Sequence, residues 1–177
     1  MELSEHAALV APELADLAGA TGERLRARAW RVATAESLTG GAIAAALTAV
    51  AGSSDYVAGG LVTYQSEQKT RQLGMPAELI ERCGVVSEEV ARAMVRGAAQ
   101  RFGVECAVAV TGVAGPASAD DPQPVGTVWI ATSLCGDVRA LCYAFGEVGR
   151  DAVRLATVKA ALQQLCEQID AEFLRTT

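Results

Sequence analysis

Three residues of this sequence have the types and spacing needed for nucleophilic chemistry: Ser37, Tyr64 and Lys69. Ser37 ends an apolar run, RVATAES, and is followed by Thr39-Gly40-Gly41 and then a helical pattern. These features predict a buried strand, a tight turn and a helix. A serine on such a turn can act as a nucleophile. The N–H groups at the start of the helix can hold an oxyanion or a phosphate.

A base for this serine has to come from a residue other than histidine. The sole histidine, His6, lies near the N-terminus and is a poor candidate, so Lys69 is the natural choice. A lysine with a pKa near 10.4 is protonated at pH 7, and its pKa must fall by about 3 units, some 4 kcal/mol. The helix expected from about Ser66 contributes only about 0.3–1 kcal/mol, so burial must supply most of the shift. Tyr64 could relay the proton or hold the lysine in place.

The rest of the chain predicts the framework around these residues. Apolar, β-branched runs predict strands at 31–36, 56–64, 106–111, 126–133 and 138–145. The last two are expected to form an antiparallel hairpin, and Gly59 and Gly60 are expected to mark a bulge or a close approach of backbone. Helices are expected at 41–50, 66–73, 76–84, 87–102 and 150–173. Together these elements predict one α/β domain over residues 1–177: three α/β/α layers, a mixed, mostly parallel sheet of about five strands, and a packed N-terminal helical segment, 1–29.

Three polar stretches follow strands in this plan. They are Glu36 to Gly41, Tyr64 to Lys69, and Thr111 to Pro116. Because the carboxyl ends of parallel strands meet at one edge of a sheet, we expect all three stretches to form one cleft. The polar loop that follows, 116–124, is long enough to cover a site. Ser37, Tyr64 and Lys69 would then lie together.

Composition argues against several classes of function. The formal charge of −6 and the pI near 4.8 disfavour a nucleic acid partner. No apolar stretch approaches roughly 18 residues, and the N-terminus has no basic segment, so we expect a cytoplasmic protein without a membrane partner. The five cysteines are odd in number and lack a C-x-x-C pair, which predicts reduced thiols, no metal site and no cofactor: Cys83, Cys106, Cys135, Cys142 and Cys166.

Several motifs in order resemble a known family. AESLTGG, AGSSDYV, GGLVTYQSEQK, GVVSEEV, TGVAGP and PVGTVWIA are similar to the C-terminal domain of the CinA competence and damage-inducible proteins, over about residues 31–165. Stand-alone members of that family are nicotinamide-nucleotide amidases. The resemblance implies hydrolysis of the carboxamide of nicotinamide mononucleotide to nicotinate mononucleotide and ammonia, without a metal. It also implies a homo-oligomer, with a dimer expected.

The resemblance also implies roles for individual residues. Its catalytic serine falls on Ser37, its tyrosine on Tyr64 and its lysine on Lys69, and the second serine of AGSS, which the family keeps in its site, is Ser54. Arg150 is then a clamp on the substrate phosphate. Backbone N–H groups of either of two loops could hold the oxyanion or the phosphate: Thr39, Gly40 and Gly41, or Thr111, Gly112 and Gly115. Glu36 is expected to hold the turn.

The sequence departs from the family pattern near the site. Family members usually carry Gly-Gly and a lysine in the loop after GVAGP, where this chain has Ser118-Ala119 and Gln123. Gly149 replaces an aspartate, and Gln65-Ser66 replaces Ser-Asn. Two alternatives therefore stay open: a non-catalytic nucleotide-binding or protein-interaction domain linked to competence or DNA damage, and an amidase for a related amide.

Overall fold

A computed structural model of the chain describes residues 11–116 and 122–176. Its centre is a five-stranded sheet in the order β2-β1-β3-β4-β5. The strands are β1 (Val32–Glu36), β2 (Val57–Val62), β3 (Cys106–Gly112), β4 (Thr127–Leu134) and β5 (Asp137–Ala144). β1 pairs parallel with β2 and β3, whereas β3–β4 and β4–β5 are antiparallel. The predicted mixed sheet and its hairpin are confirmed, with two parallel and two antiparallel pairings.

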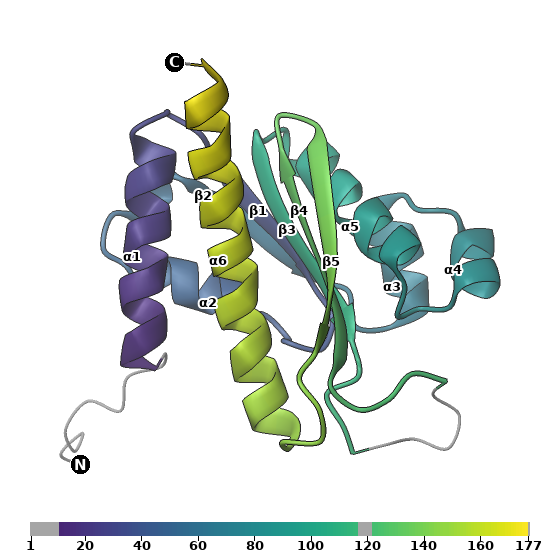
Figure 1. Cartoon of the computed structure of the whole chain (residues 1–177). Helices are drawn as coiled ribbons and strands as arrows, with labels where there is room; N and C mark the ends of the chain where they lie inside the picture. Colours follow the sequence, from purple (N-terminus) through teal and green to yellow (C-terminus); the bar gives the residue numbers. More distant parts are fainter. Residues whose placement is uncertain (1–10, 117–121, 177) are drawn as a thin grey trace, which may run out of the picture.

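Helices cover both faces of this sheet, as the predicted three layers require (Figure 1). One face carries α1 (Pro12–Arg26), α2 (Ala42–Thr48) and α6 (Arg150–Thr176). The other carries α3 (Ser66–Leu73), α4 (Ala77–Cys83) and α5 (Glu88–Phe102). A short 3-10 turn, η1 (Ser53–Asp55), precedes β2. Within the described residues, no helix has the length and apolar character needed to cross a membrane.

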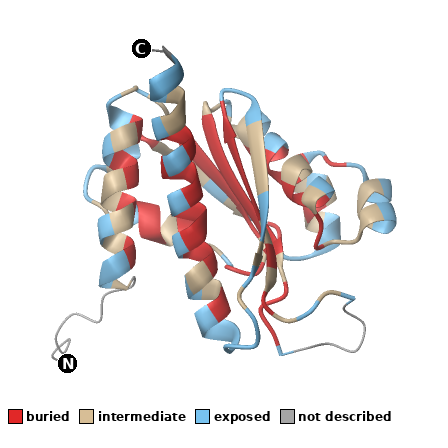
Figure 2. Ribbon diagram, viewed as in Figure 1, coloured by how far each residue is buried: buried red, intermediate tan, exposed pale blue. Residues whose placement is uncertain are grey.

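The central strand β3 divides the core between the two faces. Val108 and Val110 pack into the layer of α1, α2 and α6, whereas Ala107 and Ala109 pack into the layer of α5. Side chains alternate between the faces of a strand, so an unbroken apolar run is what burial on both sides requires. The inner strands β1, β3 and β4 accordingly form the buried centre of the molecule, whereas the edge strands β2 and β5 are intermediate or exposed (Figure 2).

Local sequence signals set several element boundaries. Ser87 caps α5, because its hydroxyl accepts a hydrogen bond from the Val90 N–H at 3.3 Å, as the sequence predicted. The register between β1 and β2 shifts next to Val32, which confirms the expected bulge. A Cβ at Gly60 would overlap Thr34 Oγ1 of β1, so this position needs glycine. The helical segment predicted over 1–29 is α1, whereas residues 1–10, His6 included, lie outside the described residues.

Candidate active site

The loops that follow β1, β2 and β3 meet at the carboxyl edge of the sheet, as expected from their parallel order. They enclose a cleft of about 380 Å³. Its lining includes most of the predicted site residues: Ser37, Tyr64, Thr111, Gly112, Gly115 and Arg150. Val85 and Val86, from the segment between α4 and α5, complete one wall. The site is therefore assembled from five separate parts of the chain.

Ser37 sits on a turn whose shape is fixed by the residue before it. The fully buried carboxylate of Glu36 accepts hydrogen bonds from the N–H groups of Gly41, Ile43 and Ala44, at 3.0, 3.0 and 2.9 Å. The hydroxyl of Thr39 donates to the same carboxylate at 2.7 Å. A carboxylate at the first turn of a helix satisfies donors that have no intrahelical partner. Glu36 thus holds the turn, as expected, and leaves Ser37 at its apex.

Lys69 lies against the nucleophile candidate. Its Nζ is 3.0 Å from Ser37 Oγ, 2.6 Å from the Thr63 carbonyl oxygen and 3.3 Å from the Tyr64 carbonyl oxygen. The Lys69 side chain is fully buried, which is rare for a lysine outside a functional site. The sequence-based pairing of this serine and this lysine is therefore matched by their geometry.

Burial also changes the proton affinity of this amine. Desolvation lowers the pKa of Lys69 from its usual 10.5 to about 8. About a tenth of the molecules then carry a neutral Lys69 at pH 7, and half do so at pH 8. The mechanism expected from the sequence needs a large fall in the pKa of Lys69, caused chiefly by burial. The lower pKa and its cause both agree with that expectation.

The hydroxyl of Tyr64 has a different partner from the one expected. Tyr64 is about half exposed, and its hydroxyl accepts a hydrogen bond from Arg150 Nη2 at 2.8 Å. Arg150 Nη1 also donates to the Gly115 carbonyl oxygen at 2.8 Å. Tyr64 therefore holds Lys69 through its backbone carbonyl, while its side chain, with Arg150, spans the mouth of the cleft. A proton relay through the Tyr64 hydroxyl has no support in this arrangement.

The backbone donors of the turn also need a correction. The N–H of Gly40 donates to the Ser37 carbonyl oxygen at 3.0 Å, and the N–H of Gly41 donates to Glu36. These two groups are already occupied and cannot hold an oxyanion. Among the described residues, the N–H groups of Leu38 and Thr39 have no protein partner. Thr39 is fully buried and does not line the cleft, so the Leu38 N–H, directly after the nucleophile, is the donor that remains available.

The second candidate loop serves the site in another way. The Thr111 hydroxyl donates to the Val85 carbonyl oxygen at 2.8 Å and fixes the wall formed by Val85 and Val86. Gly112 lies where β3 approaches β4, since a Cβ there would come within 2.7 Å of the Thr127 carbonyl oxygen. Gly115 contributes a carbonyl oxygen to Arg150. Ser118 and Ala119 lie outside the described residues.

Ser54 is not brought to this cleft. It lies in η1, before β2 begins, whereas Tyr64 and Lys69 follow the end of that strand. Because β1 and β2 are parallel, Ser54 lies at the amino ends of these strands and Ser37 at their carboxyl ends. The six residues of β2 between them correspond to a separation of about 20 Å. We therefore remove Ser54 from the predicted catalytic set of a single chain.

The described residues contain no group of three or more His, Cys, Asp or Glu side chains placed to hold a metal ion. The five cysteines are unpaired. The chemistry that can be built from the cleft is therefore that of Ser37, Lys69 and the surrounding backbone groups.

Comparison with known proteins places this geometry in a family. A family model described as the CinA C-terminal domain matches residues 14–169. The chain belongs to the CinA C-terminal domain family. A crystal structure of a competence/damage inducible protein from Agrobacterium tumefaciens superimposes with a TM-score of 0.87 at 40% identity, covering 92% of this chain and 99% of that one.

Two relatives within the CinA family differ in length. The chain is 50% identical over 151 residues to the nicotinamide-nucleotide amidohydrolase PncC of Pseudomonas putida, covering 85% of this chain and 94% of that protein. It is 45% identical over 150 residues to a CinA-like protein of Gemmatimonas aurantiaca, covering 85% of this chain. It spans only 35% of the length of that longer protein.

One residue that contacts the CinA-family site was missed by sequence reasoning. Arg154 of α6 donates to the carbonyl oxygens of Leu38 and Thr39, at 3.1 and 3.0 Å. Arg154 follows Arg150 by one helical turn, so the two side chains share a face of α6. That spacing was a usable signal, because the resemblance already directed Arg150 to the site.

Proposed function

We propose that this chain hydrolyses the carboxamide of nicotinamide mononucleotide, with Ser37 as nucleophile and Lys69 as base. The observation that carries the proposal is the contact at 3.0 Å between Ser37 Oγ, which lines the cleft, and the Nζ of the buried Lys69, whose pKa is lowered to about 8. The Pseudomonas putida relative, which is named for an amidohydrolase of nicotinamide nucleotides, supports the choice of substrate.

In the structure Lys69 Nζ donates to Ser37 Oγ and to the carbonyl oxygens of Thr63 and Tyr64, and the neutral amine that the mechanism needs can keep the same three contacts with one reversed. A neutral amine has two N–H bonds and one lone pair, and the carbonyl oxygens of Thr63 and Tyr64 accept the two N–H groups. The lone pair is then left for the third contact, Ser37 Oγ. Lys69 is held in the orientation that accepts the serine proton.

The reaction then follows in two halves. As Lys69 takes the proton of Ser37, Oγ bonds to the amide carbon and the carbonyl oxygen becomes an oxyanion. Lys69 passes that proton to the nitrogen, the carbon–nitrogen bond breaks, and ammonia leaves an acyl ester on Ser37. Water, deprotonated by Lys69, attacks this ester. The proton returns to Ser37, and nicotinate mononucleotide is released.

Arg150 is proposed to bind the phosphate of this substrate. Its guanidinium lies exposed at the mouth of the cleft, between Tyr64 and Gly115, and is not paired with any carboxylate among the described residues. A guanidinium can bind a phosphate in a bidentate manner. Gln65, which lines the cleft at a position where the family pattern has serine, favours a related amide as the second candidate substrate.

The test is ammonia release from nicotinamide mononucleotide, with the product identified by mass spectrometry. Wild-type protein should turn the substrate over. Ser37→Ala should not, because the nucleophile is lost. Ser53→Ala is the matched control and should retain activity, because Ser53 lies in η1 at the amino end of β2, away from the cleft. If the wild type shows no turnover, a panel of related amides decides between a changed substrate and a binding domain without catalysis.

The assembly and location proposed from the sequence are a cytoplasmic homodimer. Val62 on the edge strand β2 and Leu141 on the edge strand β5 are 52% and 49% exposed, so both sheet edges carry apolar surface. Light scattering on the purified protein measures the assembly. A monomeric mass across the working concentration range would contradict the dimer.

A further inference from the structure

Thr63 carries a buried hydroxyl without a partner, next to the proposed base. The residue is fully buried, and its Oγ1 is one of two buried side-chain oxygen or nitrogen atoms in the described residues that make no hydrogen bond. The other is Oε1 of Gln168, whose Nε2 is bonded to Asp137. An unpaired hydroxyl in the interior destabilises a fold, so its presence calls for an explanation.

The pairing of β1 with β2 brings Thr63 beside the nucleophile. The ladder ends with Glu36 opposite Val62, and the Thr63 N–H donates to the Glu36 carbonyl oxygen at 2.8 Å. This hydrogen bond continues the parallel ladder by one residue, so Thr63 lies next to Ser37. Neighbouring strands lie about 4.7–4.9 Å apart, which is the spacing expected between these two residues.

Both side chains face the layer that contains the base. Two residues before Ser37 and Thr63, Ala35 and Leu61 pack into the core cluster of α5. Side chains two residues apart in a strand point to the same face, so Ser37 and Thr63 point to this layer as well. α3, which carries Lys69, covers the same face. The contact between Lys69 Nζ and Ser37 Oγ at 3.0 Å agrees with this orientation.

The Thr63 hydroxyl lies close to Lys69 Nζ. Nζ already donates to the carbonyl oxygen of Thr63 at 2.6 Å, the shortest of its three contacts. Covalent geometry keeps the hydroxyl of a threonine within about 3–4.5 Å of its own carbonyl oxygen. A lysine ends in a flexible four-carbon chain, so rotations near its end are enough to bring Nζ to the hydroxyl.

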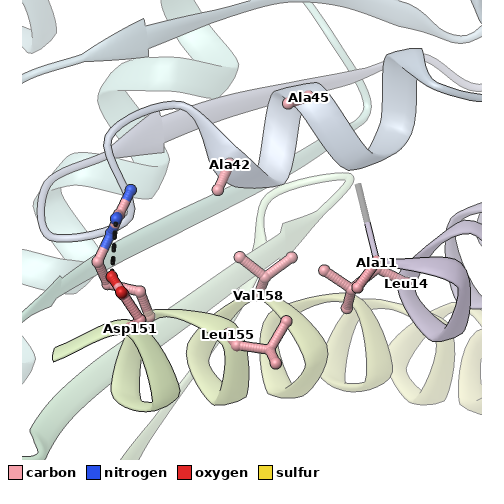
Figure 3. A pocket seen from close by; sticks show the side chains of 8 residues that line it. Ala11, Leu14, Ala42, Ala45, Asp151, Leu155 and Val158 are labelled. Carbon is pink, nitrogen blue, oxygen red and sulfur yellow. Dashed lines mark ion pairs between the residues drawn. The ribbon is translucent and has the colours of Figure 1, made fainter. Parts of the chain in front are cut away.

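Among the described residues, the α6 side of the Ser37 turn has no free partner for the lysine. Arg154 lies there, and its guanidinium donates to the carbonyl oxygens of Leu38 and Thr39. The groove of about 330 Å³ behind it is lined by apolar side chains apart from Arg154 and Asp151, which are paired with each other at 3.6 Å (dashed line in Figure 3). A new partner for Lys69 therefore has to come from the α3 side.

We propose that the Thr63 hydroxyl takes over from Ser37 as the hydrogen-bond partner of Lys69 Nζ while Ser37 is acylated. This inference rests on the proposed serine mechanism. Once Oγ is part of an ester, it has no proton to donate to a neutral amine and is a weak acceptor for an ammonium. A hydroxyl both donates and accepts, so it serves either form of Lys69. Thr63 is thus a positioning residue, which keeps Lys69 in place to take a proton from the water that attacks the ester.

The effect should be confined to the second half of the reaction, and p-nitrophenyl acetate is the probe. Ser37 Oγ bonds to the acetyl carbon and p-nitrophenol leaves; water then adds to the ester, acetate is released and a proton returns to Oγ. With this activated ester, an initial burst of p-nitrophenol reports acylation and the later steady rate reports deacylation. In Thr63→Val we expect an unchanged burst and a steady rate lower by about 3- to 30-fold, part of the roughly 10²–10⁴-fold that a general base contributes. kcat and KM should fall together, so that kcat/KM is unchanged.

Stability separates this role from a structural one. Thr63→Val removes an unpaired buried hydroxyl and should raise the melting temperature, although deacylation slows. Thr63→Ser keeps the hydroxyl and should deacylate at a rate close to that of the wild type.

Thr132→Val is the matched control. Thr132 is also a fully buried threonine at the sheet, in β4, and does not line the cleft. Its hydroxyl has a partner, because it accepts a hydrogen bond from Gln164 Nε2 at 3.2 Å. This substitution should lower the melting temperature without changing the burst or the steady rate.

Several results would refute the role of Thr63. They are a steady rate in Thr63→Val equal to that of the wild type, a Thr63→Ser variant as slow as Thr63→Val, a lower melting temperature in Thr63→Val, and a wild type without a burst. A wild type that is acetylated but does not hydrolyse nicotinamide mononucleotide would refute the proposed substrate alone, because the probe contains no nucleotide.

Discussion

At the scale of single residues, the site depends on a lysine that is buried without a carboxylate partner among the described residues. Lys69 is surrounded by Ser37 Oγ and two backbone carbonyl oxygens, none of which carries a charge. Desolvation of the charged form is therefore uncompensated, and the pKa falls to about 8. That difference from 10.5 corresponds to about 3 kcal/mol, which the fold has to supply in order to present a neutral amine.

The pH dependence of the reaction follows from this pKa. The neutral form of Lys69 is the base, and its population rises as pH increases through about 8. We expect kcat/KM to rise about tenfold per pH unit below that value and to level off above it. Lys69→Arg, with a guanidinium that stays protonated, should be inactive throughout. A profile that falls between pH 7 and 9 would contradict Lys69 as the base.

Sequence reasoning found the residue types of this site better than their contacts. Ser37 and Lys69 were predictable because both follow parallel strands and the chain has only one histidine. The partner of the Tyr64 hydroxyl is Arg150, 86 residues away, and side-chain direction over such a separation cannot be read from strand order. Ser54 was assigned to the site by resemblance alone, although the parallel order of β1 and β2 puts it at the amino ends of the strands, opposite the cleft.

At the scale of elements, α3 positions Lys69 and is itself positioned by α5. A Cβ at Gly97 of α5 would overlap the backbone oxygen of Leu73, the last residue of α3. Leu73 lies one helical turn after Lys69. The glycine therefore allows two helices to approach closely, and it connects the packing of α5 to the place of the base.

Gly97→Ala tests this connection. Alanine favours helix by about 1 kcal/mol over glycine, but here it must displace the backbone of α3. We expect a net loss of about 1–3 kcal/mol in the free energy of unfolding and a lower kcat, because Lys69 moves with α3. Gly19→Ala in α1, where nothing lies within 4 Å of the added Cβ, is the control and should gain about 0.5–1 kcal/mol. Equal effects of both substitutions in urea unfolding would contradict the role of Gly97.

The elements themselves were largely predictable, for identifiable reasons. α3 was expected at 66–73 and lies at Ser66–Leu73, and the cap at Ser87 gave the start of α5. α2 begins at Ala42, where Glu36 accepts N–H groups of its first turn, and ends at Thr48, before the end of the alanine-rich stretch 41–50. Its start depends on a tertiary contact from β1, which helix propensity does not contain.

At the scale of the whole molecule, one sheet joins the two halves of the chain. β1 and β2 come from the first half, β3 to β5 from the second, and β1 pairs directly with β3. The two core clusters lie on opposite faces of this sheet, so neither layer can separate without exposing the strands between them. The chain should therefore unfold as a single domain.

The two tryptophans allow this prediction to be checked, since each reports one layer. Trp30 packs against the cluster of α1, α2 and α6, and Trp129 of β4 packs against the cluster of α5. Each can be observed alone in the Trp129→Phe or the Trp30→Phe variant. In a single cooperative domain, the fluorescence of each variant and its own far-ultraviolet circular dichroism should give the same urea midpoint. Within either variant, a fluorescence midpoint that differs from the circular dichroism midpoint would show that one helical layer unfolds independently of the sheet, and the single-domain prediction would be wrong.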